Sequence, residues 1–138
     1  MIAEVFYMPQ TLGANDIELN RVRLLHETQQ LRHFVSRSIT WELLLVIYEL
    51  EGIGDYGIND YIDKLQTMKT TRLTIQNFVK DRIHEGSLIV TSSNKRSRKT
   101  LILSPKLREE LEAYFEWITE INSSVISTIR KETANRTT

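Results

Sequence analysis

A single predicted β-hairpin interrupts a sequence whose other segments have helical spacing. The short runs Leu88–Thr91 and Thr100–Leu103 have the composition of strands, and a polar loop joins them. Gly86 ends the segment before the first run, and Pro105, with Ser104 as its cap, suits the first turn of a long helix after the second run. The sequence therefore predicts a mainly α fold with one small β-hairpin.

The helices expected before the hairpin differ in how much of their surface is apolar. From Trp41 to Leu50 the residues are apolar nearly all round, as in a helix at the middle of a small core. A short helix near 58–65 follows, and the helix over 71–84 has one apolar face. We expect a single domain with an N-terminal helix, a central unit and a C-terminal helix, over residues 15–37, 38–104 and 105–131.

The composition excludes several classes of protein. The chain of 138 residues has no cysteine, which rules out disulfides and thiolate metal sites. Its N-terminus lacks the basic start of a signal peptide, and the longest apolar run, residues 43–48, is far too short to span a bilayer. We expect a soluble, cytoplasmic protein that is not bound to a membrane.

Charge is segregated along a chain whose formal net charge is zero. Residues 69–99 carry eight cationic side chains against two acidic ones, whereas residues 40–63 carry six acidic side chains and no basic one. Such segregation predicts that one face meets a polyanion, although a charge run can also be ordinary solvated surface.

The order helix, short helix, turn, helix and hairpin predicts a winged helix-turn-helix domain that binds double-stranded DNA. The second helix of the pair must then expose its polar face to a major groove. Asn and Gln side chains can pair with adenine, Arg with guanine, and Thr with either. The alternative is a solvated helix. The residues predicted to read DNA are Thr71, Arg72, Thr74, Gln76, Asn77 and Lys80.

The loop of the hairpin is the second predicted contact with DNA. Four cations within five residues can neutralise backbone phosphates or enter a narrow minor groove. An uncharged polar turn would serve equally well if the loop only joined two strands. The residues predicted for this wing are Asn94, Lys95, Arg96, Arg98 and Lys99.

The segment "IHEGSLIVTSSNKRSRKTLILSPKLREEL" resembles the wing region of the multiple antibiotic resistance regulator (MarR) family. Gly86 matches the turn, Arg96 the wing arginine, and Leu103–Leu107 the start of the following helix. Asn94 stands where the family has an aspartate that braces the wing arginine, and Leu107 replaces a glycine. The similarity covers about residues 39–115 and implies a transcription repressor that dimerises through its terminal helices.

The last helix carries a heptad-like apolar seam with spacings of 4, 3, 4, 3 and 4. We expect this seam to meet a second copy, in a homodimer whose two-fold axis matches a pseudo-palindromic DNA site. The alternative is that the helix packs only on its own domain. The predicted dimer residues are Leu107, Leu111, Tyr114, Ile118, Ile121 and Val125.

Features of an enzyme or of a cofactor site are not found in the sequence. It has no Gly-rich phosphate loop and no nucleophile motif, and its histidines lack metal-ligand spacing. Glu109 and Glu110 are expected on a solvent face. Many members of the MarR family bind small aromatic acids, and this resemblance implies a similar pocket. Aromatic residues at helical spacing are nevertheless more typical of a core. We therefore assign no effector to Tyr7, Trp41, Tyr48, Tyr114 or Trp117.

The expected function is that of a sequence-specific transcription regulator acting as a homodimer, with repression as the default inferred from the resemblance. One alternative is a protein-interaction or scaffold module that uses the acidic stretch 40–63 to bind a basic partner. Another is a DNA-binding accessory of replication, partition or a mobile element.

Overall fold

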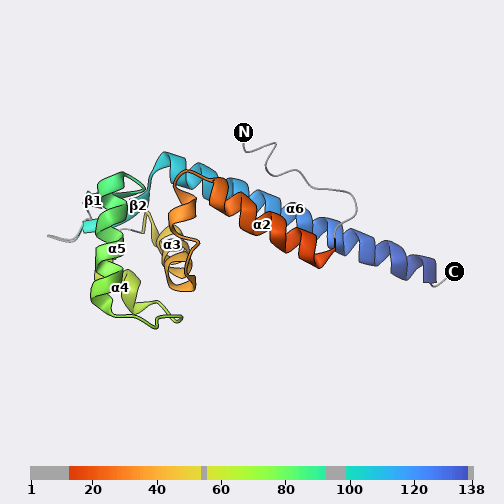
Figure 1. The fold of residues 1–138 in the computed structure, drawn as a ribbon, viewed down its shortest axis with the longest axis horizontal. Helices are drawn as coiled ribbons and strands as arrows, with labels where there is room; N and C mark the ends of the chain where they lie inside the picture. Colours follow the sequence, from red (N-terminus) through yellow and green to blue (C-terminus); the bar gives the residue numbers. More distant parts are fainter. Residues whose placement is uncertain (1–12, 54–55, 93–98, 137–138) are drawn as a thin grey trace.

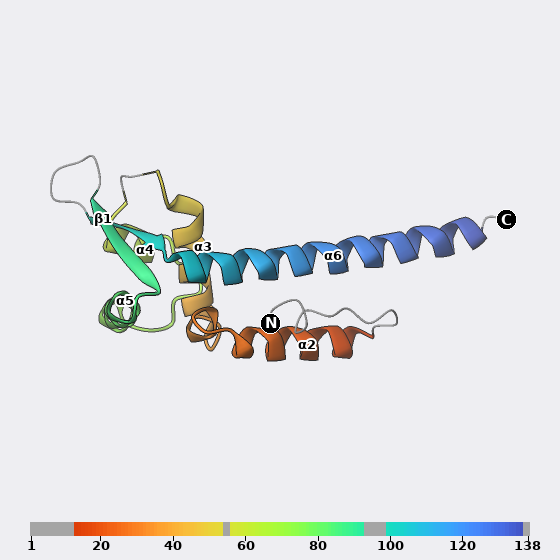
Figure 2. The same cartoon turned by 90° about the horizontal axis from the view of Figure 1, so that it is seen from above.

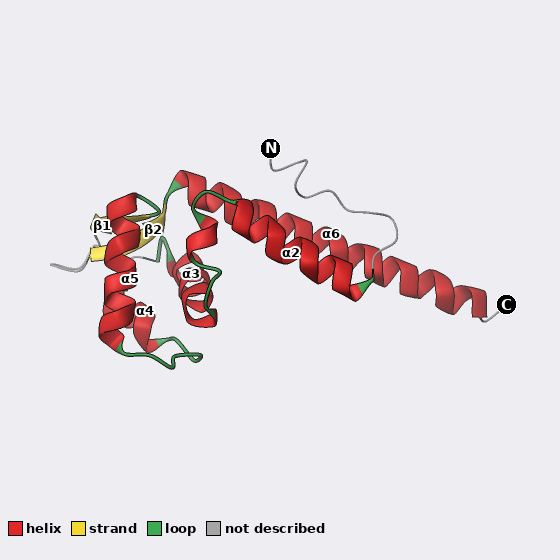
Figure 3. Cartoon of the chain, in the orientation of Figure 1, coloured by secondary structure: helices red, strands yellow, loops and turns green. Residues whose placement is uncertain are grey.

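The computed structural model describes residues 13–53, 56–92 and 99–136, and the surroundings of their side chains as far as residue 123. Five α-helices, one turn of 3₁₀ helix and one antiparallel pair of strands are found in these residues (Figure 1, Figure 3). The elements are α2 (Ala14–Glu27), η1 (Leu31–His33), α3 (Ser38–Leu50), α4 (Ile58–Asp63), α5 (Arg72–Glu85), β1 (Leu88–Ser92), β2 (Lys99–Leu103) and α6 (Pro105–Arg136).

The chain divides into a head and an arm. The head contains α3, α4, α5 and the hairpin, and the arm consists of α2 lying antiparallel to the first part of α6 (Figure 1, Figure 2). Helix α6 has 32 residues and is about 48 Å long, whereas the 14 residues of α2 span about 21 Å. The far end of α6 therefore extends beyond α2, as both views show.

Helix α3 lies at the centre of the head, as its composition predicts. Leu43, Leu44 and Ile47 have no exposed surface, and the other apolar residues of this helix are buried or half-buried. Around it the core takes side chains from α4, α5, the hairpin and the start of α6. The helices followed by a two-stranded hairpin are compatible with a winged-helix layout.

The hairpin forms over the two predicted runs and extends each by one residue at the loop. Leu88 pairs with Leu103 at its base, and Ser92 pairs with Lys99 at the other end. The phenolic oxygen of Tyr61 in α4 accepts a 3.2 Å hydrogen bond from the backbone N–H of Leu101. Burial raises the pKa of this tyrosine, because a phenolate would lose more hydration than the neutral ring.

The N-terminal helix is shorter than the predicted 15–37. Helix α2 ends at Glu27, and Thr28 is already extended, with a ψ of 156°. The carboxylate of Glu110 in α6 accepts the backbone N–H groups of Gln29 and Gln30, at 2.7 and 3.0 Å. Because these backbone N–H groups donate to a side chain and not to carbonyls of α2, the helix does not continue and the chain turns at this point. Glu110 is only 2% exposed, so its predicted place on a solvent face is wrong, whereas its neighbour Glu109 is exposed.

Candidate nucleic-acid interface

Helix α5 is fixed at both ends and along one face. At its start the hydroxyl of Thr71 accepts a 3.2 Å hydrogen bond from the backbone N–H of Thr74. At its end Gly86 is left-handed, with a φ of 97°, and stops the helix as predicted. Ile75 and Val79 are buried in the head. The opposite face of α5 is thereby held outward in a defined orientation.

That outward face carries one line of exposed side chains. Leu73, Asn77, Lys80 and His84 follow one another at intervals of four, three and four residues, so they lie along one side of the helix. All four are exposed, and Leu73 is 62% exposed. In the described part of the chain, Asn77 and Lys80 have no hydrogen bond or ion pair within the protein. They are free to bind a ligand on this face.

Two of the predicted DNA-reading residues turn sideways towards α4 instead. Arg72 forms an ion pair with Asp63, and its guanidinium also lies 3.4 Å from the side-chain oxygen of Asn59. The amide nitrogen of Gln76 donates a 2.9 Å hydrogen bond to the same oxygen of Asn59. Asn59 and Asp63 are four residues apart in one helix, as are Arg72 and Gln76 in the other. This matched spacing is a signal in the sequence that the prediction did not use.

The two predicted threonines form the cap of α5. Their hydroxyl oxygens, in Thr71 and Thr74, lie 2.9 Å apart, and the Thr71 oxygen also accepts the backbone N–H of Thr74. Both residues are exposed, so the cap remains accessible at the helix start. The six predicted residues of this helix thus separate into a cap, a pair held by α4, and the unengaged Asn77 and Lys80.

The predicted wing is described only at its edge. Lys99 is exposed and begins β2, opposite Ser92. The other four predicted wing residues lie outside the described residues: Asn94, Lys95, Arg96 and Arg98. In the described strands, the hydroxyl groups of Thr91 and Thr100 lie 2.7 Å apart and link β1 to β2.

The apolar seam of α6 lies largely inside the folded chain. Leu107 and Leu111 are fully buried, Tyr114 and Ile121 are nearly so, and Ile118 is half-buried. The surroundings of Val125 are not described. Contact with a second copy through this seam stays a prediction, and it would require side chains that are now core to move outward.

The aromatic residues considered for an effector pack against one another. The rings of Trp41 and Tyr114 meet edge to face at 5.7 Å, and those of Tyr114 and Trp117 stack at 6.0 Å. Tyr48 of α3 meets Phe115 at 5.6 Å. The first and the last of these contacts join α3 to α6, which is the packing expected of a core. Tyr7 lies outside the described residues.

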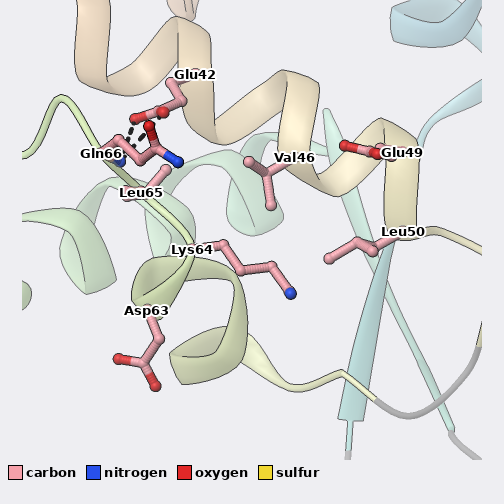
Figure 4. A pocket seen from close by; sticks show the side chains of 8 residues that line it. All are labelled: Glu42, Val46, Glu49, Leu50, Asp63, Lys64, Leu65 and Gln66. Carbon is pink, nitrogen blue, oxygen red and sulfur yellow. Dashed lines mark hydrogen bonds between the residues drawn. The ribbon is translucent and has the colours of Figure 1, made fainter.

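A separate acidic hollow lies between α3 and the end of α4 (Figure 4). It has a volume of about 520 Å³, and the apolar residues in its lining are Val46, Leu50 and Leu65. Its charged lining is Glu42, Glu49, Asp63 and one cation, Lys64. An excess of carboxylates repels a polyanion, so the lining of this hollow is unfavourable to a nucleic acid.

Glu42 at the rim of this hollow has a structural partner. Partial burial acts to raise its pKa, but hydrogen bonds from the backbone N–H groups of Thr67 and Gln66 and from the Thr67 hydroxyl leave the pKa below its usual value. The hydrogen bonds from the backbone N–H of Gln66 to Glu42 are drawn in Figure 4. The carboxylate thus caps the segment that follows α4.

Comparison with protein-family models, with curated proteins and with solved structures gives no match to this chain. Within residues whose placement is described, no group of histidine and acidic side chains is arranged to hold a metal ion. Nor does any helix in that part of the chain have the length and apolar character needed to cross a membrane.

Proposed function

We propose that this chain is a double-stranded DNA-binding transcription regulator with a winged helix-turn-helix head of the MarR type. The observation that carries the proposal is the outward face of α5, where Asn77 and Lys80 are exposed and unengaged while Ile75 and Val79 anchor the opposite side. A major groove is wide enough to admit such a helix. The nearby hairpin carries the cationic loop.

The two unengaged polar side chains have different tasks in this proposal. Asn77 pairs with the N6 and N7 edge of an adenine, which specifies sequence. Lys80 meets a backbone phosphate, which adds affinity without sequence preference. Lys99 and the adjoining cations of the loop bind phosphates or the minor groove beside the helix.

The active form in this proposal is a cytoplasmic homodimer that represses by occupying a pseudo-palindromic site. The long arm is suited to hold two heads one DNA turn apart. Leu19 and Val22 on α2 are about 40% exposed, which leaves apolar surface along the arm for a second copy. Light scattering measures the mass of the purified chain in solution, and a homodimer should have twice the mass of one chain.

A protein-interaction module is the second candidate, and the acidic hollow is the observation that favours it. Its lining combines a few apolar side chains with three carboxylates against one cation, which suits a basic peptide. A module of this kind would have no use for the cationic loop.

Binding of the full chain to random and genomic DNA fragments at several salt concentrations separates the two candidates. We expect log affinity to fall linearly with log salt, and some fragments to be clearly preferred. Lys80→Ala should reduce the salt slope by about 1 for each protomer, as should removal of other phosphate contacts. Arg96→Ala with Arg98→Ala should weaken binding further.

The matched control is Arg23→Ala. Arg23 is an exposed cation on α2, away from the head, and has no hydrogen bond or ion pair within the described protein. Its replacement should leave the slope unchanged. Absence of DNA binding even at low salt, or equal loss in Lys80→Ala and Arg23→Ala, contradicts the proposed function and favours the interaction module.

A further inference from the structure

The most exposed large apolar side chain in the described part of the chain lies on the same line as Asn77 and Lys80. Leu73 is 62% exposed, although it belongs to a helix whose other face is anchored in the core. The core contacts of α5 are made by the buried Ile75 and Val79 and by the partly buried Phe78 and Ile83. Packing in the head therefore does not account for a leucine at position 73. It leaves an apolar group facing water at the front of the helix.

The neighbours of Leu73 leave it as the foremost group of the first turn. Arg72 and Gln76 are held sideways by Asp63 and Asn59 of α4. Thr74 serves the cap through its backbone N–H and its hydroxyl. The first turn of α5 therefore presents the aliphatic side chain of Leu73 to solvent, because the polar side chains beside it are held by other contacts.

We propose that Leu73 is a specificity-determining residue that recognises the 5-methyl group of a thymine in the major groove. This inference rests on the proposed function, since it assigns the base read by part of that same face. The thymine methyl is the apolar group that a base pair presents in the major groove, and apolar side chains are its usual partners. Cytosine and uracil lack this methyl, so the contact selects T·A pairs.

Asn77 extends the assignment to a second base pair. It follows Leu73 by one helical turn, a distance of about 6 Å along the axis. Successive base pairs are about 3.4 Å apart, so both side chains reach pairs within the same short stretch. Because Asn pairs with adenine, we expect each half-site to hold a thymine and an adenine at the positions read by α5.

The test uses the full chain and a duplex selected from random sequence for tight binding. Each thymine of the half-site is replaced in turn by deoxyuridine, which removes only the methyl group. At one position wild-type protein should lose about fourfold in affinity, the effect of one buried methyl group. Leu73→Ala should bind the original duplex about as weakly and show no further loss with deoxyuridine at that position. Such non-additivity marks a direct contact.

Ile53→Ala is the matched control, since Ile53 is 58% exposed but lies in the segment after α3. It should keep the fourfold response to deoxyuridine. A full response in Leu73→Ala, or no response to deoxyuridine at any position in wild type, overturns the inference while leaving DNA binding intact. If wild-type protein selects no duplex at all, the proposed function and this inference both fail. Leu73 is exposed, so its replacement by alanine does not threaten folding.

Discussion

The carboxylate of Glu110 accepts a 2.7 Å hydrogen bond from the backbone N–H of Gln29, a residue 81 positions earlier in the chain. It also accepts the N–H of Gln30, while the Gln30 side chain accepts a hydrogen bond from the hydroxyl of Ser104. Backbone amides just after a helix need partners when they are partly buried. These bonds therefore fix the turn at which the arm passes into the head.

Glu110→Gln should lower the free energy of unfolding by about 2–4 kcal/mol, because a neutral amide cannot accept both N–H groups as well as a carboxylate does. Glu109→Gln, at the exposed neighbouring position, should change it by less than about 0.5 kcal/mol. Denaturant titration followed by circular dichroism measures both. Equal stability of the two variants would mean that the turn does not depend on this carboxylate.

Asp63→Asn should strengthen DNA binding, because it releases Arg72 from its ion pair towards the groove. One additional contact between an arginine and a base corresponds to roughly a tenfold gain. Glu49→Gln removes the same charge from α3 and should give a much smaller gain. Fluorescence anisotropy on a selected duplex compares them. Adding Arg72→Ala to Asp63→Asn should abolish the gain, and a gain that persists contradicts the assignment.

Stability should depend on pH through Glu42. Its folded pKa is lowered, so its contribution is present above the pKa of the unfolded state and is lost as pH falls through the folded pKa. Glu42→Gln should therefore cost about 0.5–1 kcal/mol at neutral pH and nothing in strong acid. Thermal unfolding from pH 7 to pH 2 follows the difference. Glu49→Gln is the control, because Glu49 is exposed on the same helix and accepts no hydrogen bond in the described part of the chain, so its replacement should cost less at neutral pH.

Gly86→Ala should lower the free energy of unfolding by about 1–2 kcal/mol, the cost of a left-handed conformation for a residue with a Cβ atom. No atom lies within 4 Å of the position that this Cβ would take, so the backbone alone bears the cost. Gly86→Asn should cost less, since asparagine tolerates this conformation. Equal losses in the two variants would indicate a steric cause instead.

Local signals in the sequence predicted the hairpin and the helix ends beside it. Gly86 stops α5 and Ser104 caps α6 because glycine conformation and serine capping act within a few residues. The turn after α2 escaped prediction because its cause, Glu110, is distant in sequence. The helical spacing of apolar residues in the sequence continues to Leu31 and Val35, so spacing alone gives no reason to end the helix at Glu27.

The candidate site was predicted in part for a similar reason. Spacing placed the correct face of α5 outward, as Asn77 and Lys80 show. It did not reveal that Arg72 and Gln76 have partners in α4, since a contact between two helices depends on their relative orientation. A heptad-like apolar seam likewise has the same spacing whether it packs against a second chain or against the head and arm of its own chain.

Only Ser104 separates β2 from α6, and its backbone N–H donates a 2.9 Å hydrogen bond to the carbonyl of Ser87, next to β1. Glu51 at the end of α3 adds a second tie, accepting the N–H of Leu103 and pairing with Arg108. Because no loop lies between strand and helix, β2 and the start of α6 are held in a fixed relative orientation. Any change in the tilt of α6 relative to the head therefore also changes the direction of β2.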